Sequence, residues 1–132
     1  MMDLDNFKTI NDQYGHPVGD VALKAVADTL RSRTRVFDSI ARYGGEEFVV
    51  VMPGTGPQDA MGAAERLRVA IENMPFSPEP GVVRRLTISI GVAFSDNRNH
   101  SAELLLQAAD QAMYQAKRNG RNRVELAVSS NV

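Results

Sequence analysis

The stretch Arg42-Tyr43-Gly44-Gly45-Glu46-Glu47-Phe48 lies between two apolar-rich segments, residues 36–41 and 48–52. Apolar segments joined by Gly-Gly are typical of a β-hairpin, because tight turns need positive φ angles that glycine adopts freely. The glycines also leave backbone N–H groups uncovered, so that a phosphate or a flat base can approach. A carboxylate beside them can hold a hard cation such as Mg²⁺. Taken alone, such a stretch more often means an ordinary hairpin with solvated acids.

The composition bounds what this chain can be. Its 132 residues are the size of one domain, and 43% apolar and 23% charged residues are ordinary for a globular protein. The net charge of −1 provides no overall field for nucleic acid or an anionic membrane, and we expect neither as a partner. The absence of cysteine excludes disulfides, thiolate metal sites and a Cys nucleophile. With no signal peptide and no apolar run near the roughly 20 residues of a membrane span, a cytoplasmic location is expected.

Apolar periodicity outlines the elements on either side of the hairpin. Alternation from Leu86 to Phe94 predicts a strand with one face on the core. Helical spacing predicts four helices, with Pro17 opening the second and Gly120 following the last. Their expected ranges are residues 6–13, 18–32, 60–74 and 105–116. The order of elements indicates a central sheet covered by helices.

The two ends of the chain complete this outline. Residues 1–5 resemble the last residues of a strand whose beginning is missing, which suggests a fragment of a longer protein. Asp3, at the end of that strand, would be a partner for the Gly-Gly turn if the two strands were neighbours. Residues 96–100 predict a polar loop, residues 123–128 a closing strand, and residues 129–132 a polar tail.

Several short motifs recur together and in order along the chain. They are DLDNFKTIND at 3–12, YGH at 14–16, GD at 19–20, RYGGEEF at 42–48, TISIGV at 87–92, AD at 109–110, YQAK at 114–117 and GRN at 120–122. The set resembles the GGDEF domain of diguanylate cyclases over nearly the whole chain. Each motif alone is weak evidence, whereas the ordered set is highly specific. The turn has GGEEF in place of GGDEF, a variation that the family accepts in active members.

The resemblance implies both a fold and a reaction. The implied fold is α+β, a palm-like or ferredoxin-like nucleotidyl cyclase fold with a central, mostly antiparallel five-stranded sheet flanked by helices. It would span residues 1–128 and lack the N-terminal helix and the start of the first strand. The implied reaction condenses two GTP molecules into cyclic di-GMP and releases pyrophosphate.

The resemblance also implies metal ligands. Asp3, the backbone carbonyl of Leu4 and Glu46 would hold Mg²⁺ or Mn²⁺, two ions per half-site, and Glu47 would be an auxiliary ligand. Glu46 would also assist deprotonation of the attacking 3′-hydroxyl, which makes Glu46 and Asp3 the candidate catalytic residues. Two metal ions can clamp the attacking and leaving oxygens of a phosphoryl transfer, which is mostly positioning and charge neutralisation. Asp5 is expected to be structural.

A larger set of residues would bind the nucleotide. The substrate-binding residues that the resemblance implies are Phe7, Lys8, Asn11, Asp20, Gly44, Gly45, Lys117 and Arg121. Asn11 and Asp20 would bind guanine, whose N1–H and N2–H₂ edge offers donors to a carboxylate. Lys117 and Arg121 would reach the β- and γ-phosphates. These positions also have an ordinary explanation, because helix dipoles favour acids in first turns and cations in last turns.

Arg35-Val36-Phe37-Asp38 forms an R-x-x-D sequence just before the hairpin. In the family this position binds cyclic di-GMP as an inhibitor, so the resemblance implies product inhibition through Arg35 and Asp38, with Arg66 as a secondary contact. The alternative is a plain ion pair worth about 0–1 kcal/mol.

One such site binds one GTP, whereas the product joins two. The resemblance therefore implies a homodimer whose half-sites face each other, controlled by an upstream sensory or receiver domain. Two other functions stay open. A sensor that binds GTP or cyclic di-GMP without turnover is disfavoured by Asp3 and Glu46, and a related cyclase acting on ATP is disfavoured by Asn11 and Asp20.

Overall fold

The computed structural model describes residues 1–96 and 100–128 as a single sheet covered by helices on both faces. In chain order the elements are β1 (Met2–Leu4), α1 (Phe7–Tyr14), α2 (His16–Arg33), β2 (Ser39–Gly44), β3 (Glu47–Val51), α3 (Pro57–Glu72), β4 (Ile88–Val92), α4 (Ala102–Arg118) and β5 (Val124–Leu126). The five strands are ordered β2-β3-β1-β4-β5. Only β4 and β5 pair in parallel. The expected α+β fold with a mostly antiparallel five-stranded sheet is confirmed.

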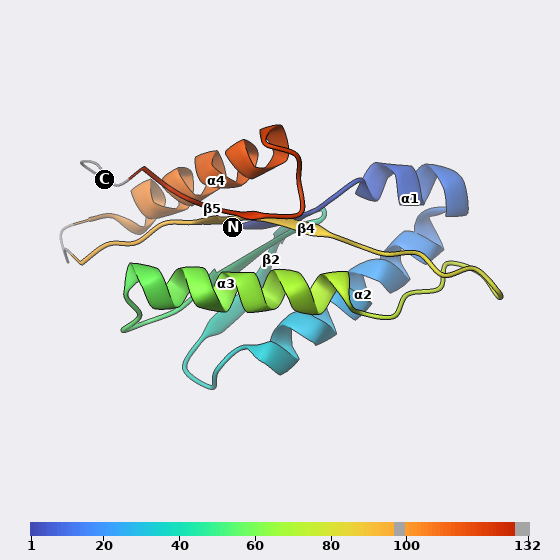
Figure 1. Ribbon diagram of the computed structural model, residues 1–132, viewed down its shortest axis with the longest axis horizontal. Helices are drawn as coiled ribbons and strands as arrows, with labels where there is room; N and C mark the ends of the chain where they lie inside the picture. Colours follow the sequence, from blue (N-terminus) through green and yellow to red (C-terminus); the bar gives the residue numbers. More distant parts are fainter. Residues whose placement is uncertain (97–99, 129–132) are drawn as a thin grey trace.

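Each face of the sheet has its own core. Figure 1 shows α4 on one face, α2 and α3 on the other, and α1 beyond the end of β1. The larger cluster lies on the face of α2 and α3 and includes the fully buried Leu4, Leu30 and Ile71. A smaller cluster under α4 contains Ala109 and Met113. Removal of these apolar side chains from water holds the layers together and fixes α4 above the strands.

The strand β4 is buried on both faces, so the prediction of one core face was wrong. All five of its residues, Ile88–Val92, are buried. The alternation in this segment separates large side chains from small ones rather than buried from exposed ones. On the α4 side, a Cβ atom added at Gly91 would lie 2.1 Å from the carbonyl oxygen of Ala109 and 2.2 Å from the backbone nitrogen of Met113. The backbone of α4 therefore rests directly on β4.

The boundaries of most elements differ from the predicted ones by a few residues. The helix α2 has Pro17 in its first turn, as predicted, but begins at His16. The strand β2 begins at Ser39 and excludes Val36 and Phe37, which are 96% and 78% exposed. A turn interrupts the chain there, because the N–H of Asp38 donates to the carbonyl of Arg35.

Some sequence expectations are only partly covered by the structure. The strands β4 and β5 are shorter than the predicted 86–94 and 123–128. Residues 97–99 of the predicted loop and the predicted tail 129–132 lie outside the described residues. The assignment of residues 1–128 to one domain stays a prediction. No helix in residues 1–96 and 100–128 combines the length and the apolar character that a membrane span requires.

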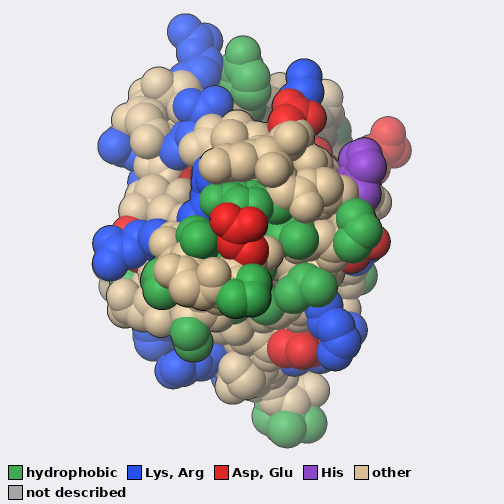
Figure 2. All heavy atoms as spheres, turned by 90° about the vertical axis from the view of Figure 1, so that its right-hand side faces the viewer, with side chains coloured by type: hydrophobic (Ala, Val, Ile, Leu, Met, Phe, Trp, Pro, Cys, Tyr) green, Lys and Arg blue, Asp and Glu red, His purple; other side chains and the backbone are tan. Residues whose placement is uncertain are grey.

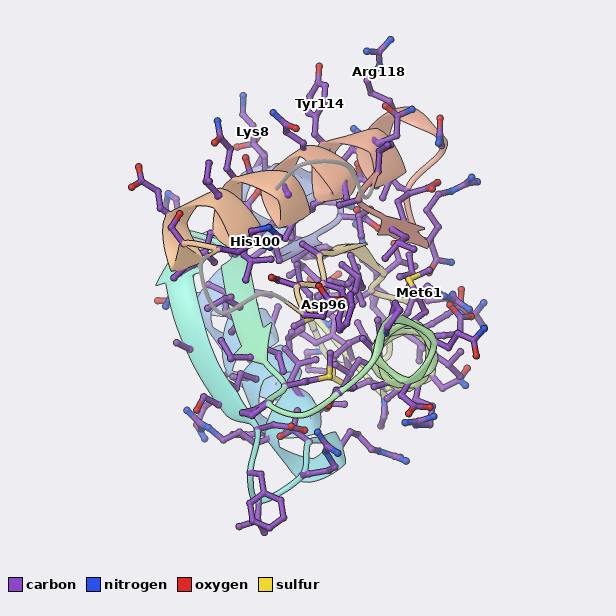
Figure 3. All side chains as sticks on the ribbon, turned by 90° about the vertical axis from the view of Figure 1, so that its left-hand side faces the viewer. Lys8, Met61, Asp96, His100, Tyr114 and Arg118 are labelled. Carbon is purple, nitrogen blue, oxygen red and sulfur yellow. The ribbon has the colours of Figure 1, made fainter. Side chains whose placement is uncertain are left out.

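A large apolar groove opens between α3, α4 and the hairpin. Its volume is about 720 Å³, and its lining includes Val51, Ala64 and Leu105. Figure 3 looks into this groove, with α4 above it, α3 to the right and Asp96 near the middle of the view. None of the expected site residues lines it. The candidate site therefore lies elsewhere, at the turn of the hairpin.

Candidate functional site

The turn between β2 and β3 is formed by Gly45 and Glu46. Gly44 is still paired, opposite Glu47, so the prediction of Gly44-Gly45 as the turn was wrong by one residue. The cause is a shift in the ladder between Arg42 and Gly44, which carries the strand one residue further. Gly45 has φ +37°, a conformation that favours glycine. The shift places Glu46 within the turn itself, where its carboxylate stands beside the end of β1.

Acidic side chains from β1, from the turn and from β3 lie close together here. The expected neighbourhood of Asp3 and the hairpin is confirmed, because β1 pairs with β3 and Asp3 lies opposite Glu47. The N–H of Leu4 donates to the carbonyl of Glu46 over 3.2 Å. Burial, and then the Asp3 carboxylate, raise the pKa values of both Glu46 and Glu47. A raised pKa means that the ionised form of each carboxylate is disfavoured at this place, and a nearby cation would stabilise that form.

A lysine from the last turn of α4 contacts the same acids. Lys117 Nζ donates to Asp3 Oδ1 over 2.7 Å and to Asp5 Oδ1 over 2.9 Å. It also lies 3.5 Å from the carbonyl oxygens of Asp3 and Leu4. The family resemblance implies a phosphate contact for Lys117, which stays a prediction, and the structure adds these carboxylate contacts.

Asp5 is a buried carboxylate with a full set of donors. It is 4% exposed. Besides Lys117, it accepts hydrogen bonds from Ser89 Oγ at 2.6 Å, Thr87 Oγ1 at 2.8 Å and the N–H of Asn122 at 3.0 Å. Burial alone would raise the pKa of Asp5, but the hydrogen bonds from Ser89, Lys117 and Thr87 outweigh it and lower that pKa. These contacts tie β1, β4 and α4 together and support the expectation that Asp5 is structural.

The carboxylates of Asp3 and Glu46 and the carbonyl oxygen of Leu4 form what we call the acidic cradle. Within residues 1–96 and 100–128, no three His, Cys, Asp or Glu side chains gather closely enough to hold a metal ion by themselves. Mg²⁺ does not need such a cage, because it usually takes one or two carboxylates and completes its shell with phosphates and water. The hard oxygen donors of the acidic cradle and the raised pKa of Glu46 fit a cation bound together with a nucleotide.

The candidate base site lies on the α2 side of the hairpin. Asn11 Oδ1 is buried, and no described residue donates to it. Asp20 lines a cavity of about 370 Å³ between α2 and the hairpin, together with Leu23, Arg42 and Phe48. Buried acceptors without a donor are rare in folded proteins. The Asp20 carboxylate lines this cavity and is suited to accept hydrogen bonds from a ligand edge rich in N–H groups. The Asn11 oxygen lies against Gly19 and is not part of the cavity lining.

The candidate phosphate-binding groups surround the turn. The first N–H groups of α1, including those of Phe7 and Lys8, have no partner within the helix and suit an anion. A Cβ atom added at Gly44 or Gly45 would meet nothing within 4 Å, so the turn is open. Arg121 is exposed, and its side chain makes no hydrogen bond or ion pair within the described residues. It is therefore free to bind an anionic ligand.

The face of the molecule at the α1 end carries charges of both signs. Figure 2 shows acidic side chains at its centre, hydrophobic ones around them, and Lys and Arg side chains mainly at its periphery. A face of this kind is not the broad basic surface that binds a nucleic acid backbone.

The expected inhibition site lies at the opposite end of the hairpin. Asp38 directly precedes β2, so six strand residues, or about 20 Å, separate it from the turn. Arg35 Nη2 contacts Asp38 Oδ1 at 3.0 Å and Thr55 Oγ1 at 2.7 Å. The hydrogen bond from Arg35 holds the pKa of Asp38 below its usual value. Arg66, on α3, makes no hydrogen bond or ion pair within the described residues, so the structure does not join it to this pair.

Sequence reasoning missed two residues of this region. Arg42 Nε donates to the carbonyl of Gly45 over 2.8 Å and so braces the turn. Asn122 donates its backbone N–H to Asp5, while its side chain accepts from Arg68 Nη1 at 2.8 Å and donates to Glu72. Arg42 lies in the motif RYGGEEF and Asn122 in the motif GRN. Their places in these motifs were the only sequence features that could have pointed to them, because neither contact follows from residue type.

Comparison with known proteins assigns the chain to a family. A sequence model described as "Diguanylate cyclase, GGDEF domain" matches residues 1–123. Diguanylate cyclase A of Treponema denticola is 46% identical over 127 residues, which are 96% of this chain and 34% of that protein. Response regulator PleD of Caulobacter vibrioides is 46% identical over 125 residues, which are 94% of this chain and 28% of that protein. The chain thus spans about a third or less of the length of these relatives.

Solved structures agree with the fold. The active GGEEF domain of a diguanylate cyclase from Vibrio cholerae superposes with a TM-score of 0.89 at 36% identity, covering 98% of this chain and 81% of that one. The GGDEF domain of DgcB from Caulobacter crescentus, in complex with c-di-GMP, gives a TM-score of 0.90 at 32% identity, covering 97% of this chain and 75% of that one. On the family match, these relatives and the shared fold, the chain belongs to the GGDEF family of diguanylate cyclase domains.

Proposed function

We propose that this domain condenses two GTP molecules into cyclic di-GMP. In each of the two steps the 3′-hydroxyl oxygen of one GTP forms a bond to the α-phosphorus of the other, the bond to the β-phosphate bridge breaks, and pyrophosphate leaves. The observation that carries the proposal is the meeting of Asp3 and Glu46 at an open turn. The relative from Vibrio cholerae, described as active, also has the GGEEF form of the turn.

Different residues would bind different parts of the nucleotide. Asn11 and Asp20 bind the guanine edge, and the N–H groups of Phe7 and Lys8 bind the phosphates. Lys117 and Arg121 bind the β- and γ-phosphates, where Arg can make paired hydrogen bonds. Gly44 and Gly45 leave space for the nucleotide over the turn. This arrangement orients the α-phosphate towards the hydroxyl of the second nucleotide.

The acidic cradle would supply the chemistry. Asp3, Glu46 and the carbonyl of Leu4 would hold the divalent cations, Mg²⁺ or Mn²⁺ and two per half-site, which neutralise phosphate charge when bound; Glu47 is an auxiliary ligand. Glu46 also accepts the proton of the attacking 3′-hydroxyl. Its raised pKa makes it a better base than an ordinary glutamate.

One chain offers one such half-site, so the proposed active form is a homodimer with two-fold symmetry. The relatives are about three times as long as the match or longer, which supports an upstream sensory or receiver domain as the regulator of this pairing. We further propose a cytoplasmic location, where GTP is available.

We also propose product inhibition by cyclic di-GMP at Arg35 and Asp38, with Arg66 as a secondary contact. The support is the Arg35 side chain, which is 55% accessible and whose guanidinium group is already oriented by Asp38 and Thr55. The Arg35→Ala variant should keep its turnover and lose inhibition by added cyclic di-GMP. Arg33→Ala, an exposed neighbour, is the matched control and should stay inhibited. Unchanged inhibition of the Arg35→Ala variant would overturn this site.

The decisive assay incubates the chain with Mg²⁺ and either GTP or ATP, and separates the products by liquid chromatography. We expect cyclic di-GMP from GTP, nothing from ATP, and no turnover by a folded Glu46→Gln variant. Tight GTP binding without product would favour the sensor function instead. Product from ATP alone would refute the guanine assignment of Asn11 and Asp20.

A further inference from the structure

The ammonium group of Lys117 occupies part of the acidic cradle. It contacts Asp3 Oδ1 at 2.7 Å and the carbonyl oxygen of Leu4 at 3.5 Å, and both atoms are ligands in the proposed metal site. A Mg²⁺ ion binds such oxygens at about 2.0–2.1 Å. Two cations that close together repel each other strongly, even in a partly solvated site. Lys117 must therefore leave Asp3 when a divalent cation enters.

Asp5 offers Lys117 a second position. Its Oδ1 atom lies 2.9 Å from Lys117 Nζ, and the other donors around this carboxylate are Ser89, Thr87 and the N–H of Asn122. These neutral donors fix the orientation of the carboxylate without balancing its charge. Lys117 is the one cation within hydrogen-bonding distance of Asp5 among the described residues. A buried carboxylate holds such a partner firmly, because losing it would leave an uncompensated charge.

We propose that Asp5 is a positioning residue for Lys117. In the metal-free protein the ammonium bridges Asp5 and Asp3 and competes with divalent cations for the acidic cradle. When a cation enters, Lys117 leaves Asp3 and stays on Asp5, next to the cradle, where it is available to a nucleotide phosphate. The inference deepens the proposed function, since it uses the same metal ligands, but it concerns cation binding alone and does not require turnover.

The test titrates Mn²⁺ into the nucleotide-free chain and measures free Mn²⁺ from its electron paramagnetic resonance signal. The Lys117→Met variant removes the competing ammonium and should bind Mn²⁺ about tenfold more tightly, the size expected of one neighbouring charge. The Asp5→Asn variant leaves the ammonium on Asp3 alone and should bind Mn²⁺ several-fold more weakly. Arg118→Met is the matched control: this cation lies next in the sequence but points away from the sheet in Figure 3, and its loss should change the affinity less than twofold.

The double variant Asp5→Asn/Lys117→Met distinguishes an effect of Asp5 through the position of Lys117 from an effect of the Asp5 charge itself on Mn²⁺ binding. If Asp5 acts through Lys117, the effect of Asp5→Asn on Mn²⁺ affinity should largely vanish in the Lys117→Met background. An effect of the same size in both backgrounds would overturn the proposal, and so would a Lys117→Met variant that binds Mn²⁺ no more tightly than the wild type. Thermal melts check that the variants fold, and if Asp5→Asn does not, the Lys117→Met result decides alone. Because no nucleotide is present, a failure here is distinct from an absence of cyclase activity.

Discussion

At the scale of single residues, the contact between Gly19 and Asn11 links helix packing to the base recognition that we propose for Asn11. A Cβ atom at Gly19 would lie 1.8 Å from Asn11 Oδ1 and 3.1 Å from Phe7 Cζ. In an exposed helix, Gly→Ala stabilises by up to about 1 kcal/mol. Here we expect Gly19→Ala to destabilise by about 1–3 kcal/mol, the usual cost of overpacking, and to weaken GTP binding because Asn11 is displaced. Urea unfolding and equilibrium GTP binding measure the two effects.

Gly62 provides the matched control for this substitution. It lies within α3, and a Cβ atom there would meet only Arg66 Nη1, at an ordinary 3.5 Å. Gly62→Ala should therefore be neutral or stabilise by up to about 1 kcal/mol and leave GTP binding unchanged. If Gly19→Ala unfolds at the same urea concentration as Gly62→Ala and binds GTP equally well, the link between Gly19 and Asn11 is refuted.

Glu46 should give the reaction a pH dependence that the metal concentration controls. Burial and the Asp3 carboxylate raise its pKa, so it takes up a proton at a higher pH than an ordinary glutamate. A proton and a divalent cation compete for the same oxygens, so activity is lost as the pH falls through the raised pKa. Rates measured between about pH 5 and 8 should show this acid limb moving to lower pH as Mg²⁺ is increased. An acid limb that stays at the same pH at every Mg²⁺ concentration would contradict a site on Glu46 that protons and Mg²⁺ share.

Single residues also mark where sequence reasoning stopped. The pairing of Asp3 with the turn followed from the strand end and the motif, and the structure confirms that the two strands are neighbours. The contacts of Lys117 with Asp3 and Asp5 did not follow. Residue type predicts a cation near phosphates, but the position of a long side chain depends on which carboxylates surround it after folding. Those carboxylates come from residues more than a hundred positions away.

At the scale of elements, the packing of α4 on β4 positions Lys117. The backbone contact at Gly91 brings the helix as close to the sheet as it can come, and Lys117 sits at its last turn. Gly91→Ala would push a methyl group into the backbone of Ala109 and Met113. We expect a loss of about 3 kcal/mol or more in the free energy of unfolding, at or above the upper end of ordinary overpacking, measured by urea denaturation.

Gly44 is the control for the loss of a strand glycine. It lies in β2, has no positive φ, and a Cβ atom there would meet nothing within 4 Å. Gly44→Ala should change the free energy of unfolding by no more than about 0.5 kcal/mol. Equal stability of the Gly91→Ala and Gly44→Ala variants would show that α4 can move away from β4 at little cost.

The same element shows why the sequence predicted β4 only in part. Period-two alternation correctly indicated a strand, but the small residues on its second face looked like solvent-facing positions. Whether Ser89 and Gly91 face water or a helix depends on α4, which is distant in sequence and whose alanines, such as Ala109 and Ala112, allow close approach. Burial of the second face is thus a tertiary effect that local pattern does not contain.

At the scale of the whole molecule, the hairpin lies between two candidate binding regions of different chemistry within one chain. The base cavity lies between the hairpin and α2, and the acidic cradle lies where β1, the turn and α4 meet. The motif order predicted this set of residues. The sheet order β2-β3-β1-β4-β5 explains how they assemble, because it places β1 in the centre, with its C-terminal end beside the turn. A nucleotide crossing the turn would contact both sides, and its 3′-hydroxyl would still need a second nucleotide.

The need for two chains can be tested by mixing. If cyclic di-GMP forms only between two competent half-sites, nine parts of folded Glu46→Gln added to one part of wild type should lower the rate per wild-type chain about tenfold, because most wild-type chains then face a silent partner. The reason is that, in the proposed reaction, each 3′-hydroxyl attacks the nucleotide of the facing chain. The matched control adds the same amount of wild-type chain, which should raise the total rate at least in proportion. If the rate per wild-type chain is the same with and without the added Glu46→Gln variant, one chain completes the reaction alone.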